Sequence, residues 1–425
     1  MLGRLIFCTA PSNIVALREV DTGVHYGEDA PQDKDKLVER TPSREIDVNH
    51  PASIIAAIYL GVIGAAVFIV QPGFVQGLVA ELGYDEQQAG YVVAIEVWGI
   101  ALTSIFLAMG GYRFSWERIL TLSIILFFIG NICSTFTNQI TFFSSSRFLA
   151  GLGAGGLVSL TFTIIGLTRF ADRNFGYLIA AVLTYGALGL WIMPTAFSLV
   201  GLDGVIIFFA LFGASGWWCI KLMPNSGEAQ LQVEEDSFDL GSVARIFAVV
   251  SMFFYFFAQG VIWAYLFLIG IDGGVSEQGV ANGLMASQFF GIAGAMVAVV
   301  LGRSFGRLTP LALGILGGAG ILLLLLDPFS AFLFALIVCV YNFAWNVTHP
   351  FLLGAMASFD KTGRVVVYAV AAQMLGLATG PAVGAMLLGD GDYHTVVLTG
   401  IMLFVFSYLL ILQPLLAHRR LVNLN

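Results

Sequence analysis

Long apolar segments, each separated from the next by a short polar break, fill this sequence from about residue 53 onward. A helix needs about 20 apolar residues to cross the roughly 30 Å hydrocarbon core of a bilayer. Hydrophobic residues make up 58% and charged residues 11% of the 425 residues, which is far from the composition of soluble domains. The chain is therefore predicted to be an all-α, multi-pass membrane protein. Twelve spans are expected, at 53–79, 88–109, 117–133, 140–166, 175–199, 204–223, 242–269, 277–301, 309–326, 330–357, 364–388 and 393–417.

The basic residues are unevenly distributed between the two sides of the predicted membrane. Of the 19 Lys and Arg residues, all but Arg147 fall in the termini or in even-numbered loops, and the odd-numbered loops contain neither. Short cytoplasmic loops are enriched in Lys and Arg. We therefore expect both termini to be cytoplasmic and the protein to lie in the cell membrane. One missed helix would invert every later loop, so this regularity also supports the count of twelve.

Polar stretches divide the chain into five parts. Residues 1–52 are mixed in charge and poor in apolar side chains, which is typical of a disordered tail. The longest polar stretch between spans, residues 224–241, is acidic and follows the sixth span. It is predicted to be a cytoplasmic connector between an N-terminal six-helix bundle at 53–223 and a C-terminal six-helix bundle at 242–418. Residues 419–425 then form a short cytoplasmic tail.

The two predicted bundles resemble each other at a period near 190 residues. Short matches in apolar sequence arise by chance, but here three of them fall in corresponding spans at nearly one period. The matched positions are Glu96 with Gln288, Gln71 with Gln259, and Pro194 with Pro381. Internal repeats are common in secondary transporters, so the bundles are expected to be related by pseudo-symmetry.

An arginine lies inside the fourth predicted span and is followed by a ladder of glycines. Arg at the centre of a membrane helix costs about 2.5–3.5 kcal/mol on insertion scales, so Arg147 needs a partner or a water-filled cavity. Gly151 and Gly155 are four residues apart and lie on one helix face, where small residues let another helix approach closely. This helix is predicted to pack through its glycines and to present Arg147 to a functional site.

Glu96 is the only acidic residue well inside a span, and it lies at about the same predicted depth as Arg147. Burial favours the protonated form of a carboxyl group, whereas a neighbouring cation favours the ionised form. Glu96 could thus bind a proton in one conformation and release it in another. The second bundle has neutral Gln288 at the corresponding position, which confines the charge pair to the first bundle. The alternative is that Glu96 and Arg147 only lock two helices together.

Polar and aromatic side chains recur at helical spacing in the seventh and tenth spans. Polar stripes on membrane helices usually face a cavity, although an aromatic stripe is also explained by packing. In the first span, Gln71-Pro72-Gly73 interrupts the helix, which can mark a binding site or simply bend the chain. The candidate substrate-binding residues are Gln71, Arg147, Gln259, Trp263, Asn342, Trp345, Asn346 and His349.

These features together resemble the major facilitator superfamily of secondary transporters, over about residues 53–418. The family's span-4 motif is similar to the segment containing Phe143, Arg147, Gly151, Gly153 and Ala154, although Ala150 stands where glutamine is usual. The family's basic loop after the second span, and its counterpart in the second bundle, are only partly kept. The glycine-proline motif of the family's antiporters does not fit the fifth span, but the eleventh span fits it. The resemblance implies roles in helix packing or gating for Gly151, Gly155, Pro194, Gly376, Gly380, Pro381, Gly384, Arg113, Arg118, Arg303 and Arg307.

The predicted function is secondary active transport of a small organic solute by alternating access, as proton-coupled symport. The aromatic residues and the single buried arginine favour an amphipathic or aromatic organic anion. A proton/drug antiporter on the same fold is the alternative. No nucleophile, metal cluster or paired catalytic carboxylates are visible, so an enzyme is not expected, and a passive channel would leave the one-sided charge pair unexplained. No cofactor besides the coupling proton and no nucleic-acid partner are expected, and the protein is predicted to work as a monomer in the lipid bilayer.

Overall fold

The computed structural model describes residues 46–110, 114–224, 238–301, 306–361, 364–388 and 393–422. The described residues belong to one compact unit. Residues 1–45 of the predicted tail, most of the predicted acidic connector and the last three residues lie outside the described part of the chain.

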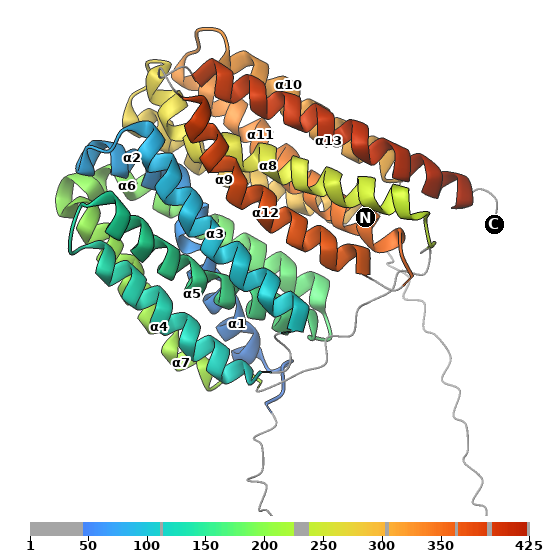
Figure 1. The fold of residues 1–425 in the computed structure, drawn as a ribbon, viewed down its shortest axis with the longest axis horizontal. Coiled ribbons are helices and arrows are strands. Elements are labelled where there is room, and N and C mark those ends of the chain that lie inside the picture. Colours follow the sequence, from blue (N-terminus) through green and yellow to red (C-terminus); the bar gives the residue numbers. More distant parts are fainter. Residues whose placement is uncertain are drawn as a thin grey trace, which may run out of the picture. The chain divides into compact units, whose positions relative to one another are not determined.

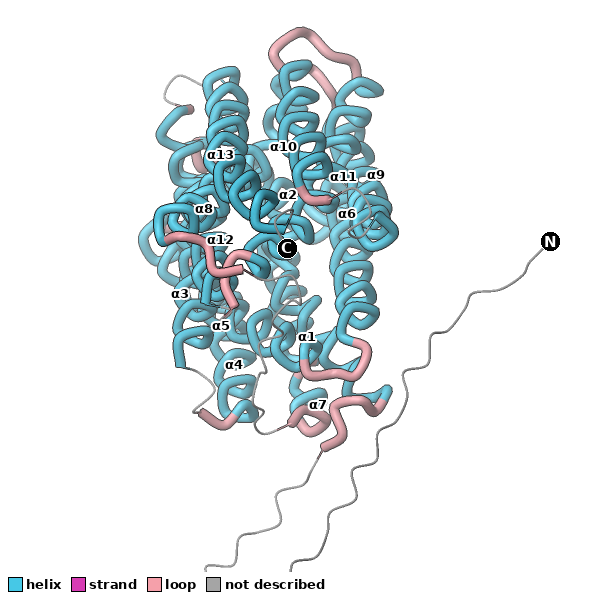
Figure 2. Tube along the Cα trace, turned by 90° about the vertical axis from the view of Figure 1, so that its right-hand side faces the viewer, coloured by secondary structure: helices cyan, strands magenta, loops and turns pink. Residues whose placement is uncertain are grey.

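Helices account for the regular structure of the described residues, which form no strand. The all-α prediction is therefore confirmed (Figures 1 and 2). The helices are α1 (Pro51–Ile69), α2 (Gln71–Leu82), α3 (Glu86–Gly110), α4 (Trp116–Ser134), α5 (Ile140–Gly166), α6 (Ala171–Ser215), α7 (Trp217–Ile220), α8 (Ser242–Asp272), α9 (Glu277–Leu301), α10 (Leu308–Leu322), the 3-10 helix η2 (Leu323–Leu325), α11 (Ala331–Ser358), α12 (Arg364–Leu387) and α13 (Tyr393–Val422).

Within the described residues, 11 helices are long and apolar enough to cross a membrane. One of them, α6, has 45 residues; as one straight helix it would be about 68 Å long at 1.5 Å per residue, which exceeds a single crossing. Its backbone is non-helical at Gly201, where φ is 66° and ψ is −179°, a conformation that favours glycine. Gly201 therefore divides α6 into the predicted fifth and sixth spans, which restores the expected number of crossings.

The first span is interrupted where the sequence places Gln71-Pro72-Gly73. Helix α1 ends at Ile69, Val70 has φ −101° and ψ 13°, and α2 begins at Gln71. Proline has no backbone N–H, so Pro72 cannot donate to the carbonyl of Phe68 as a residue in a continuous helix would. Trp263 of α8 donates its Nε1–H to that carbonyl at 3.3 Å. The break thus leaves the carbonyl of Phe68, in the first half of the chain, free to accept a hydrogen bond from a side chain of the second half.

The helices of each half of the chain pack mainly on one another. In the first half, α1, α3 and α4 pack against α5, and α1 and α4 also pack against α6; in the second half, α9 and α10 pack against α11, while α12 and α13 pack against α8. The halves meet mainly where α3 packs against α12 (Figure 1), α6 against α9, and α2 against α8. We propose these two groups as the bundles predicted at 53–223 and 242–418.

Glycines set the close approach of α5 to α3. A Cβ atom built on Gly151 would collide with the backbone carbonyl oxygen of Glu96, and one built on Gly155 would lie 2.5 Å from that of Ile100. Neither neighbour is the flexible end of a side chain, so the helices themselves would have to move apart.

We expect Gly151→Ala to lower the free energy of unfolding by about 1–3 kcal/mol, as overpacking of a tight core does. Thermal unfolding of the purified protein in detergent measures the effect. Gly317→Ala is the matched control, because Gly317 is a helical glycine of α10 with no heavy atom within 4 Å of a built Cβ. Equal melting temperatures for the two variants would contradict the tight contact at Gly151.

Candidate functional site: a buried ion pair between α3 and α5

Glu96 of α3 and Arg147 of α5 form an ion pair that is buried inside the first half of the chain. The Arg147 Nη2 atom lies 2.5 Å from Glu96 Oε1, and the Nε atom donates to Oε2 at 3.1 Å. Arg147 has no exposed surface and Glu96 is 3% exposed. The two parallel hydrogen bonds give a bidentate geometry, which is the strongest form of the Arg–carboxylate interaction.

The glycine ladder explains why these two side chains meet. Gly151 follows Arg147 by one helical turn, and its Cα lies against the backbone of Glu96 itself. Because no side chain separates α5 from α3 there, Glu96 and Arg147 are close enough for direct contact. The span-4 motif thus supplies both the cation and the helix approach that pairs it with the acid.

Asn131 of α4 is a third partner of the arginine. Arg147 Nη1 donates to Asn131 Oδ1 at 2.8 Å, and the Asn131 amide donates to the carbonyl of Phe127 at 2.8 Å. The neighbouring Gly130 lies against the backbone of α5, so α4 also approaches α5 closely at this level. Asn131 was not among the residues predicted from the sequence, although an amide in an otherwise apolar span indicates a polar partner.

Phe74 of α2 completes the surroundings of the guanidinium group. The Cζ atom of Arg147 lies 5.1 Å from the centre of the Phe74 ring, within the range of a cation–π interaction. Arg147 therefore contacts α2, α3 and α4 from α5. With Asn131 and Phe74 in place, the cation would keep two favourable contacts if Glu96 became neutral and left it.

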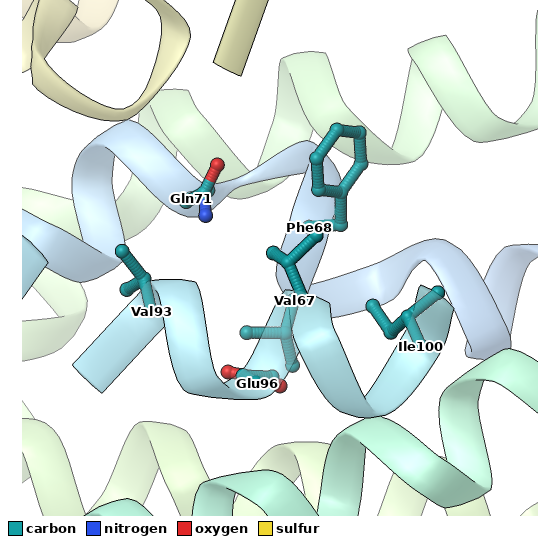
Figure 3. A pocket seen from close by; sticks show the side chains of 7 residues that line it. Val67, Phe68, Gln71, Val93, Glu96 and Ile100 are labelled. Atoms are coloured by element: carbon teal, nitrogen blue, oxygen red, sulfur yellow. The ribbon is translucent and has the colours of Figure 1, made fainter. Parts of the chain in front are cut away.

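A small cavity adjoins the carboxyl side of the ion pair (Figure 3). Its volume is about 10 Å³, which is about enough for one water molecule and far too little for an organic solute. The lining comes from the end of α1, the start of α2 and one face of α3. The lining residues are Val67, Phe68, Gln71, Val93, Glu96, Val97 and Ile100.

Two tryptophans of the second half lie close to this region. The ring centres of Trp263 and Trp345 are 5.8 Å apart in a T-shaped arrangement, and Trp263 also donates to the carbonyl of Phe68. Because Phe68 lines the cavity with Glu96 and Gln71, these contacts connect Trp263 and Trp345 to the charged site.

The other predicted binding residues of the second half have partners within it. Gln259 accepts a hydrogen bond from Tyr341. Asn342 donates to Ser287 of α9 at 3.2 Å, and Asn346 donates to Asn342 Oδ1 at 2.7 Å. These contacts of the second half join uncharged amides and hydroxyls on α8, α9 and α11.

His349 lies in a separate contact. Its Nε2 atom is 3.1 Å from Gln373 Oε1 of α12, and its ring packs on Phe256 at 4.9 Å. Neither contact reaches the cavity beside Glu96.

Comparison with known proteins identifies the family. The family model described as Major Facilitator Superfamily matches residues 56–365. The chain belongs to this superfamily. It is therefore a multi-pass membrane protein with the fold of secondary transporters that work by alternating access. The search of curated protein sequences returns no match.

Solved structures support the same fold for this superfamily member. The crystal structure of the D-xylose-proton symporter is similar with a TM-score of 0.66 and 17% identity, covering 84% of this chain and 96% of that chain. The partially occluded, inward-open conformation of the xylose transporter XylE from E. coli is similar with a TM-score of 0.65 and 14% identity, covering 85% and 97%. At such identities the likeness is one of fold.

The residues with a packing or gating role implied by the superfamily motifs fall into three groups. Gly376, Gly380 and Gly384 of α12 lie against α8, next to Phe253, Gly260 and Tyr265 respectively. Pro194 and Pro381 lie within α6 and α12, and neither helix is interrupted at its proline. Arg118 is exposed and Arg307 half-buried, while Arg113 and Arg303 lie outside the described residues.

Proposed function

We propose that this superfamily member is a symporter that carries a small organic anion together with a proton. The observation that supports the proposal is the ion pair of Glu96 and Arg147, which is buried between helices and not exposed to water. Breaking a buried ion pair by neutralising one partner leaves the other charge uncompensated, which is strongly unfavourable. Protonation of Glu96 is therefore favoured when another anion reaches Arg147.

Charge balance links the proton to the substrate. In the empty carrier Arg147 is neutralised by ionised Glu96. In the loaded carrier protonated Glu96 is neutral, and the carboxylate of the substrate takes its place beside the guanidinium group. Neither state buries a net charge, so both can change conformation. A carrier that holds only the proton buries one positive charge, and a carrier that holds only the anion buries one negative charge. The need to bury no net charge thus couples the transport of the proton to that of the anion, without any direct contact between the two.

The remaining candidate residues would hold the uncharged part of the substrate. Trp263 and Trp345 offer aromatic faces next to the cavity, and Gln259, Asn342, Asn346 and His349 offer amide and imidazole groups on α8 and α11. The cavity of about 10 Å³ does not admit a solute, so we propose that substrate binding requires the two halves to separate. We assign Gln71 and Arg147 to the same binding region.

The two similar structures are those of a D-xylose-proton symporter and of a xylose transporter. Coupling to protons on this fold supports the proposed coupling here. The proposed substrate is an anion, unlike xylose, and the proposal of a negative charge rests on Arg147 alone. We further propose that the protein works as a monomer in the cell membrane, with both termini in the cytoplasm and no cofactor besides the proton.

Electroneutral uptake is the test of this proposal. The purified protein is reconstituted in liposomes, and uptake is measured for matched acids and amides: benzoate with benzamide, and phenylacetate with phenylacetamide. We expect an inward proton gradient to drive accumulation of an acid faster than in protein-free liposomes, where the protonated acid enters by diffusion alone, and to drive no accumulation of its amide. A membrane potential of 100 mV, set with valinomycin and potassium, should leave the accumulation unchanged, because transfer of one net charge would change it by about 50-fold.

Two outcomes would contradict the proposal. Accumulation that follows the membrane potential instead of the proton gradient would exclude joint transfer of a proton and a monovalent anion. Proton-driven export of organic cations, without uptake of any acid, would favour the proton/drug antiporter.

A further inference from the structure

Gln71 is a buried amide without a partner for its oxygen. It is 2% exposed, and its Oε1 atom makes no hydrogen bond in the described structure. A buried acceptor left without a donor costs about 1–3 kcal/mol. Gln71 is also the first residue of α2, directly after the break in the first span, and it lines the same cavity as Glu96.

The orientation of the amide matches the charge now present on Glu96. In Figure 3 the amide nitrogen of Gln71 points toward the side of the cavity where Glu96 lies, and the oxygen points away. An amide nitrogen donates hydrogen bonds, and an ionised carboxylate only accepts them. In the ion-paired state the carboxylate of Glu96 thus faces the amide N–H donor of Gln71 across a cavity with room for one water molecule. The unpaired Oε1 acceptor of Gln71 points away from the carboxylate.

Protonation changes the hydrogen-bond partner that Glu96 requires from a donor to an acceptor. A protonated carboxyl group carries an O–H donor, and Arg147 has no acceptor to offer it. Rotation of the terminal amide torsion of Gln71, which is soft and roughly two-fold, would present Oε1 to the cavity instead. We infer that Gln71 is the positioning residue that receives the proton-bearing oxygen of Glu96 when Glu96 leaves Arg147, directly or through one water molecule.

Gln71 is the polar side chain that lines the cavity together with Glu96, and the charged groups around Glu96 are few among the described residues. Among the described residues, Arg147 of α5 is the charged side chain within ion-pair distance of Glu96, and α4 adds neutral Asn131 behind it. Helix α1 and the cavity-lining part of α2 are uncharged. Helices α8 and α12 carry charged residues only at their ends; their tyrosines include Tyr265, whose hydroxyl donates to Pro381.

The position of Gln71 also connects protonation to the contact between the halves. Helix α2 packs against α8 of the second half, and Gln76 of α2 donates to Glu277 of α9 at 3.3 Å. A proton on Glu96 would therefore act on the first residue of α2, one of the helices that contact the other half. This inference rests on the proposed proton coupling and adds the residue that transmits it.

Infrared spectroscopy of the full-length protein in liposomes tests the role of Gln71 without a known substrate. Lowering the pH should produce a carboxylic C=O stretching band that is absent from Glu96→Gln. In Gln71→Met, which keeps the side-chain length but removes the acceptor, we expect this band to move to higher frequency because the O–H group has lost its hydrogen bond. Gln288→Met is the matched control, since Gln288 is also buried with an unpaired amide but does not line the cavity.

The outcomes separate the two claims. A Glu96 band at the same frequency in the wild type and in Gln71→Met would overturn the role of Gln71 and leave proton coupling intact. A wild-type protein in which no band depends on Glu96 would contradict proton coupling itself. If Gln71→Met does not fold, Gln71→Ala serves instead. Gln71→Ala replaces the amide by space for water, so the Glu96 band should change frequency in this variant as well. An unchanged frequency would overturn the inference.

Discussion

Arg147→Met should lower the free energy of unfolding by about 3–5 kcal/mol, and the double variant Arg147→Met/Glu96→Gln should recover most of that loss. The single change leaves the buried carboxylate of Glu96 without its cation, and an uncompensated buried charge costs several kcal/mol. In the double variant both partners are neutral, so that cost disappears. Unfolding in detergent, followed for the two single variants and the double variant, measures the coupling between the residues.

Arg118→Met is the control for the loss of an arginine as such, because Arg118 is exposed at the start of α4. A surface substitution of this kind usually changes stability by less than about 0.5 kcal/mol. Strictly additive losses at positions 96 and 147 would mean that the ion pair does not form in the folded protein.

Glu96→Gln should abolish accumulation of the anion by a proton gradient and preserve exchange of anion across the membrane. Without Glu96, Arg147 is neutralised only when the substrate is bound. The loaded carrier can still change conformation, but the empty carrier would have to do so with an unpaired charge. A cost of about 2.5–3.5 kcal/mol for that charge corresponds to about 100-fold slower return of the empty carrier.

Two transport assays on the same liposomes separate these steps: net uptake driven by a proton gradient, and exchange of labelled for unlabelled anion. Glu117→Gln is the control, since Glu117 is exposed in the first turn of α4. Loss of both net uptake and exchange in Glu96→Gln, with a normal melting temperature, would assign Glu96 to substrate binding and not to coupling.

The fold was predictable from the sequence because its signals are repeated many times along the chain. Apolar segments of membrane length gave the all-α, multi-pass class. The break at Gln71-Pro72 was visible because proline removes a backbone donor. The sharp break at Gly201 was not predicted, since the apolar pattern does not show whether two neighbouring spans are joined by a loop or by a single non-helical residue.

The site was only partly predictable. Depth along the helices suggested that Glu96 and Arg147 could meet, since each is the only charge well inside its span, and the structure pairs them; their role in coupling stays a prediction. Asn131 and Phe74 were missed because one sequence does not show which faces of α4 and α2 turn toward α5. Spacing placed Asn342, Asn346 and His349 on one stripe. It did not reveal that Asn342 contacts Ser287 of α9 whereas His349 contacts Gln373 of α12.

We propose that Glu96 carries the proton that accompanies the substrate. Proton movement is measured with a pH-sensitive dye inside liposomes while uptake of labelled anion is followed in parallel, and the values of protein-free liposomes are subtracted. We expect one proton to enter with each anion in the wild type, and anion exchange without proton movement in Glu96→Gln. The same proton-to-anion ratio in both proteins would rule out this role of Glu96.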